Sequence, residues 1–304
     1  MAIRNKHWPR LEWAQWQETC ETVHLWSQIV GKIRLFHMPW INHSWHVPLY
    51  MTTRGLGTSV IPYGDRAFSI DFDFVDHRLL VDTAEGNTRS FRLESMSVAS
   101  FFKQLMQVLD ELEITVQIWP MPVEIPGVVQ PFPENEKQAT YDPEAVMRFW
   151  RVLLHVHRVF SEFRARFIGK VSPVHFFWGA FDLAVTRFSG RTAPKHPGGA
   201  PNCPDWVMQE AYSHEVSSAG FWPGMGLGEA AFYSYAYSEP EGFSEYPVRP
   251  KAAYYHVELG EFILPYEAVR TADAPDAMLL EFLQSTYEAA AELAGWERNK
   301  LERK

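Results

Sequence analysis

Three segments in the second half of the chain bring ionisable residues together with aromatics and glycines: residues 172–182, 187–191 and 212–224. In the last of these, His214 and Glu215 are adjacent. A neutral imidazole beside a carboxylate is typical of divalent-metal ligation or of proton transfer. We therefore predict His214 and Glu215 as catalytic residues or as metal ligands.

Glycines and aromatics follow this pair closely, in Gly220-Phe221-Trp222-Pro223-Gly224. Apolar walls around a few polar groups are typical of small-molecule pockets, and the glycines favour a mobile loop beside such a pocket. The structural alternative is that adjacent residues of a strand point to opposite faces and that the glycine-rich loop only connects strands. The sequence leaves both interpretations open.

His175 and Asp182 lie in an apolar, strand-like run from Val174 to Phe188. In one continuous strand, residues an odd number apart face opposite sides, so this pair meets only if the strand is broken. A bulge at Gly179 would break it. We predict both side chains as catalytic partners of His214 and Glu215. A hydrogen-bonded core histidine and a buried structural carboxylate are the alternatives.

Arg187 and Arg191 are the candidate anion anchors, because guanidinium groups hold carboxylates and phosphates through paired hydrogen bonds. An even spacing also places Arg187 on the same face as His175 in a regular strand. Either arginine would equally neutralise Asp182 in a structural ion pair. The residues expected to wall the pocket are aromatic: Phe177, Trp178, Phe221, Trp222 and Tyr254.

A metal site is an open alternative, with His175, His214 and Glu215 as ligands and His196 or His256 as additions. No His-Glu-x-x-His or Cys-x-x-Cys spacing supports it, so a divalent metal is neither required nor excluded. The residues Gly224-x-Gly226-x-Gly228 lack the spacing of a dinucleotide loop, and no nucleotide cofactor is expected. The two cysteines, Cys20 and Cys203, are too far apart in sequence to indicate a thiolate site.

Composition narrows the class of protein. The 304 residues are 46% apolar, which is ample for a buried core, and the formal charge of −9 argues against a nucleic-acid partner. No run approaches the roughly 18 apolar residues of a membrane span, and no signal-peptide pattern is recognisable. We expect a soluble cytoplasmic protein with a small molecule as its partner. The oligomeric state is left open.

Hydrophobic periodicity predicts the elements that position these residues. Steps of three and four predict helices over residues 13–33, 98–112, 146–167 and 276–293. Asp142-Pro143 is typical of a helix start. Alternating runs separated by glycine turns predict an antiparallel meander between residues 45 and 93, with Phe68, Ile70 and Phe72 on the buried face.

The order of these patterns recurs. Thr53-Arg54-Gly55, an alternating run from Phe68 to Phe74 and an apolar helix have later counterparts in Thr186-Arg187-Phe188, a run from Phe232 to Tyr237 and a final helix. An internal repeat dictates architecture. We therefore predict an α+β fold of two related modules, each an antiparallel β-meander packed against helices: residues 1–120, a proline-rich connector at 121–141, and residues 142–304 carrying the site.

The three segments above, together with Tyr254-Tyr255 and Leu264-Pro265-Tyr266-Glu267, resemble an uncharacterised bacterial family known as domain of unknown function 5996. The similarity extends over nearly the whole chain, and it implies no activity, cofactor or catalytic residue. From the residues alone, the favoured hypothesis is a small-molecule enzyme with an acid/base or metal site in an aromatic-lined cleft of the second module. The alternative is a non-catalytic ligand-binding or protein-interaction module.

Overall fold

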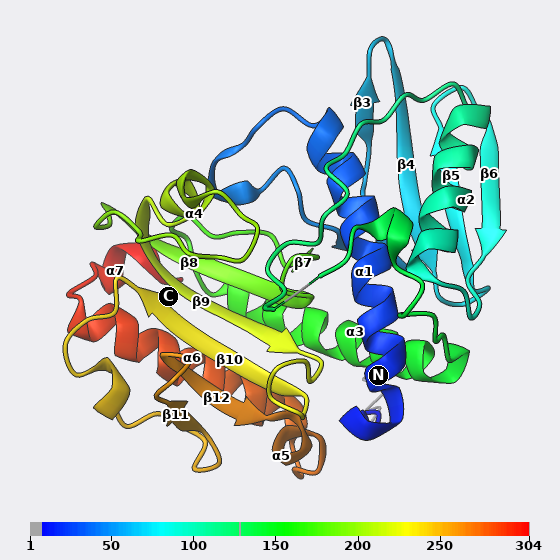
Figure 1. Ribbon diagram of the computed structural model, residues 1–304. Helices are drawn as coiled ribbons and strands as arrows, with labels where there is room; N and C mark the ends of the chain where they lie inside the picture. Colours follow the sequence, from blue (N-terminus) through cyan, green and yellow to red (C-terminus); the bar gives the residue numbers. More distant parts are fainter. Residues whose placement is uncertain (1–7, 128, 304) are drawn as a thin grey trace.

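The computed structural model describes residues 8–127 and 129–303, and it confirms the α+β class with two similar modules (Figure 1). Each module contains one antiparallel sheet of six strands. Within the described residues, no helix is both long and apolar enough to cross a membrane.

The first module opens with helix α1 and closes with helix α2, which packs on one face of the first sheet. The alternation predicted for β4 is confirmed, because Phe68, Ile70 and Phe72 are buried. Its elements are α1 (Trp13–His37), η1 (Asn42–Ser44), β1 (Tyr50–Met51), β2 (Gly55–Gly57), β3 (Ile61–Tyr63), β4 (Arg66–Asp73), β5 (Arg78–Thr83), β6 (Thr88–Arg92) and α2 (Val98–Glu111). The strand order is β1-β2-β4-β5-β6, with β3 also paired to β4.

The second module begins at α3 (Pro143–Ala165), after η2 (Phe132–Glu134) in the connector. Asp142 caps α3 as predicted, accepting hydrogen bonds from the backbone N–H groups of Glu144 and Ala145. Helices α3 and α6 cover one face of the second sheet. The strand order there is β11-β12-β10-β9-β8-β7. The elements are β7 (His175–Phe177), β8 (Asp182–Thr192), α4 (Asp205–Ala211), β9 (His214–Trp222), β10 (Ala231–Tyr237), η3 (Phe243–Glu245), β11 (Tyr254–His256), β12 (Glu261–Pro265), α5 (Tyr266–Arg270), α6 (Pro275–Leu293) and α7 (Arg298–Leu301).

Two segments that the sequence predicts as single strands form hairpins in the structure. The run from Val174 to Phe188 reverses between Phe177 and Asp182, which become paired neighbours of β7 and β8. Phe181 completes this turn in the left-handed region, with φ of 58°. The run from residue 253 to 264 likewise divides into β11 and β12.

The first strands of the two modules meet edge to edge. Leu49, beside β1, and Phe176, in β7, exchange both backbone hydrogen bonds at 2.8 Å. Counted from this edge, β4 is the third strand of its sheet and β10 is the fourth. The aromatic runs of β4 and β10, which the repeat pattern had matched, therefore do not occupy equivalent positions.

Helix α1 lies between the modules (Figure 1). The predicted apolar stripe is buried, but polar residues on its other faces are buried too, including His24, Gln28 and Lys32. One hydrophobic core includes residues of both modules, and Trp16 of α1 stacks on Phe149 of α3. Because both sides of α1 are covered, its polar side chains contact other parts of the protein interior and not bulk solvent.

Candidate functional site

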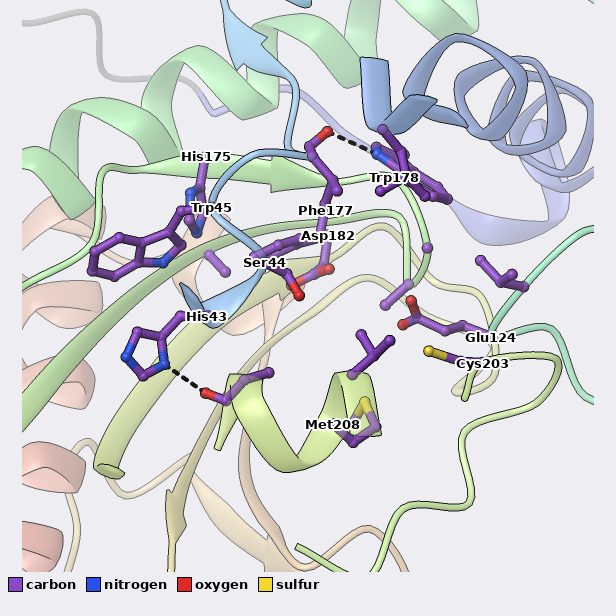
Figure 2. Close-up of a pocket in the computed structure, with 18 of the residues that line it drawn as sticks. His43, Ser44, Trp45, Glu124, His175, Phe177, Trp178, Asp182, Cys203 and Met208 are labelled. Atoms are coloured by element: carbon purple, nitrogen blue, oxygen red, sulfur yellow. Dashed lines mark hydrogen bonds between the residues drawn. The ribbon is translucent and has the colours of Figure 1, made fainter. Parts of the chain in front are cut away.

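A cavity of about 820 Å³ lies on the face of the second sheet that α3 and α6 leave uncovered (Figure 2). Strands β7, β8, β9, β10 and β12 contribute its floor. The other walls come from helix α1, η1, residues 117–119 at the end of the first module, Val123 and Glu124 of the connector, and the segment 202–212 with α4. The cavity therefore lies between the modules, and this corrects the expectation of a cleft built by the second module alone.

The β7–β8 hairpin brings His175 and Asp182 to the same face. His175 pairs with Ala184, and Phe177 pairs with Asp182, and paired residues of antiparallel strands point the same way. All four residues line the cavity. The spacing rule for one continuous strand does not apply, because the chain reverses; no bulge at Gly179 is needed.

Asp182 is held by Tyr233, whose hydroxyl donates a hydrogen bond to its carboxylate. Only 4% of Asp182 is exposed, and burial raises the pKa of its carboxyl to about 7. The Tyr233 hydrogen bond lowers this pKa, whereas the negative charge of Glu124 raises it. Asp182 therefore changes its protonation state near neutral pH, which suits a general acid or base.

Two further carboxyls line the cavity. Burial, together with the negative charge of Asp182, raises the pKa of Glu261 on β12 to about 8. The Oε2 atom of Glu261 is buried with no hydrogen-bond partner among the described residues. Burial also raises the pKa of Glu124, while Lys32 lowers it. Protein atoms surround the carboxyl of Glu124, but the residue is exposed by surface area because it lies on the wall of the open cavity.

The connector residue Glu124 is placed by hydrogen bonds from helix α1. The side-chain amide of Gln28 bonds both the N–H and the C=O of Val123, each at 2.9 Å. Glu124 itself has a φ of 60°, and its backbone N–H donates to the carbonyl of Pro201 at 2.8 Å. A strained conformation held by several partners is typical of functional positions.

Lys32 of α1 is the cationic side chain of this wall. It is 5% exposed, and within the described residues it forms no ion pair or side-chain hydrogen bond. Its Nζ atom lies 5.2 Å from the ring centroid of Trp119 and 6.0 Å from that of Trp178. Burial lowers its pKa to about 8.

The floor also carries paired hydroxyl groups and an unpaired imidazole. The hydroxyls of Tyr212 and Tyr235 are 2.7 Å apart, and those of Thr186 and Ser218 are 2.8 Å apart. His175 is fully buried, and among the described residues neither ring nitrogen has a hydrogen-bond partner. Burial lowers the pKa of His175 to about 3, so the ring is neutral.

Three of the five predicted wall aromatics line the cavity: Phe177, Trp178 and Trp222. Phe221 faces the opposite side of β9, where it is fully buried against Phe232 and Tyr266. Tyr254 lies on the edge strand β11 and does not line the cavity. Further aromatics of the wall come from α1 and the loops, with Trp40, Trp119 and Trp206 partly exposed at the rim.

Arg187 faces the helices and not the cavity, so it does not anchor a ligand there or pair with Asp182. Alternate residues of β8 point to opposite faces, and Arg187 shares the face of Leu183 and Val185. Its guanidinium carbon is 3.5 Å from the ring centroid of Phe163 and 4.4 Å from that of Tyr287. The even-spacing argument that placed it beside His175 is wrong because the two residues belong to different strands.

Arg191, His214 and Glu215 also lie outside the cavity. Arg191 forms an ion pair with Glu215 at 2.7 Å and donates to the carbonyl of Ala294. The Nδ1 atom of His214 is 3.0 Å from the Ser213 hydroxyl. The structure therefore brings His175 and Asp182 together but does not add His214 and Glu215 to them.

No three His, Cys, Asp or Glu side chains of the described residues are grouped so that they could hold a metal ion. The two additional ligand candidates lie elsewhere. His196 stacks on Tyr212, and the Nδ1 atom of His256 accepts from the backbone N–H of Leu259.

The sequence interpretation missed Lys32, Glu124, Tyr233, Tyr235 and Glu261. A signal existed for two of them, because the alternation in residues 231–237 places Tyr233 and Tyr235 on the face opposite Phe232. For Lys32 and Glu124 no local signal exists, since only the packing of the two modules brings α1 and the connector to the second sheet.

A family model described as "Family of unknown function (DUF5996)" matches residues 8–303, nearly the whole chain. No curated protein and no solved structure matches the chain significantly.

Proposed function

Since the chain belongs to the DUF5996 family, whose function is unknown, we propose from the cavity alone that it is a small-molecule enzyme in which Asp182 transfers a proton. The observation that carries this proposal is a buried carboxyl on the cavity floor, oriented by Tyr233. A carboxyl that titrates near pH 7 exchanges protons with a substrate more readily than one of ordinary pKa.

The surroundings of Asp182 support this role. The negative charge of Glu124 disfavours ionisation of Asp182, and the negative charge of Asp182 disfavours ionisation of Glu261. Such coupled carboxyls share protons and titrate as a group. The Tyr233 hydrogen bond keeps one oxygen of Asp182 occupied and fixes its direction.

The cavity also indicates the kind of substrate. Its volume is within the range of roughly 300–1,000 Å³ that holds drug-sized molecules. Its lining is largely apolar with many aromatic rings, which favours a flat or largely apolar body, and the sheet floor contributes the polar side chains of His175, Asp182 and Glu261. We propose a small organic molecule whose reactive part is directed at this floor.

A non-catalytic ligand-binding protein is the second candidate. The paired hydroxyls of Tyr212 with Tyr235 and of Thr186 with Ser218 favour it, because they bind each other and none contacts a general base. Such groups give orientation and specificity without chemistry.

The test combines a ligand screen with Asp182→Asn. Compounds are first selected by the rise in melting temperature they give the wild-type protein, and each is then incubated with it and followed by mass spectrometry. We expect selected compounds to stabilise both proteins, and only the wild type to convert one of them. Tight-binding compounds that the wild type leaves unchanged would favour the non-catalytic candidate.

A further inference from the structure

We propose that Lys32 is a nucleophile that forms a Schiff base with an aldehyde or ketone in this cavity. This inference rests on the proposed function, because it places a carbonyl substrate in the same cavity and names its class. It assigns chemistry to a residue outside the Asp182–Tyr233 pair.

The surroundings of Lys32 are unusual for a lysine. The side chain is 95% removed from solvent, lines the cavity and, among the described residues, has no ion-pair partner. The faces of Trp119 and Trp178 lie within reach of its ammonium group, and the charge of Glu124 also favours the charged form. A buried lysine in an apolar pocket is a typical Schiff-base residue because the uncharged amine is favoured there.

The protonation state of Lys32 supports the same role as a nucleophile. With a pKa of about 8, roughly one Lys32 amine in ten is uncharged at pH 7, several hundred times more than for an ordinary lysine. The nearby thiol competes poorly, because burial and Glu124 raise the pKa of Cys203 and keep it protonated.

Glu124 supplies the proton transfers that this step needs. Its carboxyl and Lys32 influence each other's pKa without forming an ion pair, and both line the cavity. The carboxyl also closely approaches Gly179, where an added Cβ would be 2.0 Å from Oε1, so its position is tightly defined. Figure 2 shows Glu124 beside Cys203, with Asp182 farther along the same cavity.

The step balances without any co-reactant. The lone pair of the Lys32 amine attacks the carbonyl carbon, a C–N bond forms, and the carbonyl oxygen takes up a proton while the nitrogen loses one. The resulting carbinolamine loses its hydroxyl as water, with the proton from Glu124, and a C=N bond forms as a protonated imine. The imine nitrogen then returns its proton to the Glu124 carboxylate. Nothing is oxidised or reduced, and the products are the imine and one water.

The experiment traps the imine in the full-length protein. Benzaldehyde is the probe, sodium borohydride reduces any imine, and peptide mass spectrometry locates the secondary amine. We expect Lys32 to be labelled at least tenfold faster than the exposed Lys103 at pH 7. Lys32→Arg should abolish the fast adduct, and Lys103→Arg should leave it intact.

A second measurement keeps the test decisive if Lys32→Arg does not fold. In the wild type, the labelling rate of Lys32 between pH 6 and 10 should level off near pH 8, whereas that of Lys103 keeps rising. Labelling confined to exposed lysines would overturn the proposal, and it would then mean that Lys32 serves only as a charge for an anionic ligand. Rapid Lys32 labelling that rises in step with Lys103 across this range would overturn it too.

The failure of this inference and the failure of the proposed function are distinguishable. Asp182→Asn should still be trapped at Lys32 although it converts no substrate. If Asp182→Asn retains turnover, the role of Asp182 is wrong while the Schiff base can still be trapped. If Lys32 resists trapping while Asp182→Asn loses turnover, the Schiff base alone is wrong.

Discussion

The hydroxyl of Tyr233 on β10 reaches the carboxylate of Asp182 on β8 by passing over the intervening strand β9. It does so at Gly220, the residue paired with Tyr233. A Cβ atom at Gly220 would lie 2.2 Å from the tyrosine hydroxyl oxygen, so only glycine leaves the path open. The absence of one side chain therefore fixes the orientation of the candidate acid or base.

Gly220→Ala should therefore destabilise the protein by about 1–3 kcal/mol through overpacking. The ring of Tyr233 must move, so the cost should nearly vanish when Tyr233→Ala is already present. Urea denaturation of the two single variants, the double variant and the wild type measures this coupling. An equal cost of Gly220→Ala in both backgrounds would contradict the packing described here.

The contribution of Asp182 to the stability of the protein should fall as the pH rises from about 4 to 7. The unfolded chain loses the Asp182 proton near 3.8, but the folded protein holds it until about 7, so the folded state binds more protons in this interval. A raised carboxyl pKa thus contributes stability that is present at low pH and is lost as the pH rises, by at most ~1.4 kcal/mol per pH unit.

Asp182→Asn isolates this contribution. The unfolding free energy of the variant minus that of the wild type should increase from pH 4 to 7 and then level off. Glu261→Gln should show the same trend up to about pH 8, in line with the raised pKa of Glu261. A pH-independent difference for both variants would show that neither carboxyl is desolvated.

Arg187→Ala should cost about 2–4 kcal/mol of stability, because it empties a buried position between the rings of Phe163 and Tyr287. Arg191→Ala is the matched control, since its half-exposed ion pair with Glu215 contributes ~1 kcal/mol or less. Guanidinium denaturation compares the two. If Arg187→Ala costs little stability but weakens the binding of cavity ligands, the prediction that Arg187 binds an anion would be supported.

Gln28→Leu should cost about 1–3 kcal/mol, because it leaves the backbone groups of Val123 buried without partners. Hydrogen exchange at residues 121–125 should also speed up, since this amide holds the connector. Gln17→Leu on the same helix is the control, as Gln17 bonds only the exposed Glu21. Unchanged exchange in Gln28→Leu would mean that other contacts hold Glu124.

His214→Ala should change ligand affinity at the cavity by less than about twofold, because His214 does not line it. His175→Ala should weaken binding more, since this buried imidazole faces the ligand. Isothermal titration with any compound that stabilises the wild type compares the two. A larger loss in the His214 variant would return the functional site to the His214–Glu215 pair.

Hydrophobic periodicity correctly predicted those features that depend only on residues close together in the sequence. The stripe of α3, its Asp142 cap and the buried face of β4 all follow from spacing within one element. For His175 and Asp182, spacing required a break in the strand near Gly179, and the chain does reverse there, through a turn over residues 178–181 and not through a bulge. Gly179 is the one residue of this turn that signals a break, and it does not distinguish a bulge from a full reversal.

The cavity is the part that the sequence could not reveal. Lys32 and Glu124 are far from Asp182 along the chain, and they reach it because α1 and the connector cross the second sheet. The favoured pair, His214 and Glu215, looked catalytic by residue type, yet the strand places it beside Arg191 at the protein surface. Of the four predicted catalytic residues, His175 and Asp182 line the cavity, and His214 and Glu215 do not.

The hydrogen-bonded contact between Leu49 and Phe176 also has a consequence for synthesis of the chain. A ribosome completes the first sheet before β7 exists, so the edge at β1 emerges with unpaired backbone groups that invite pairing with other chains. Prematurely terminated chains would keep the unpaired edge of β1 and would lack the cavity. We expect the nascent chain to be most vulnerable to aggregation in the interval between the synthesis of residues 50 and 176.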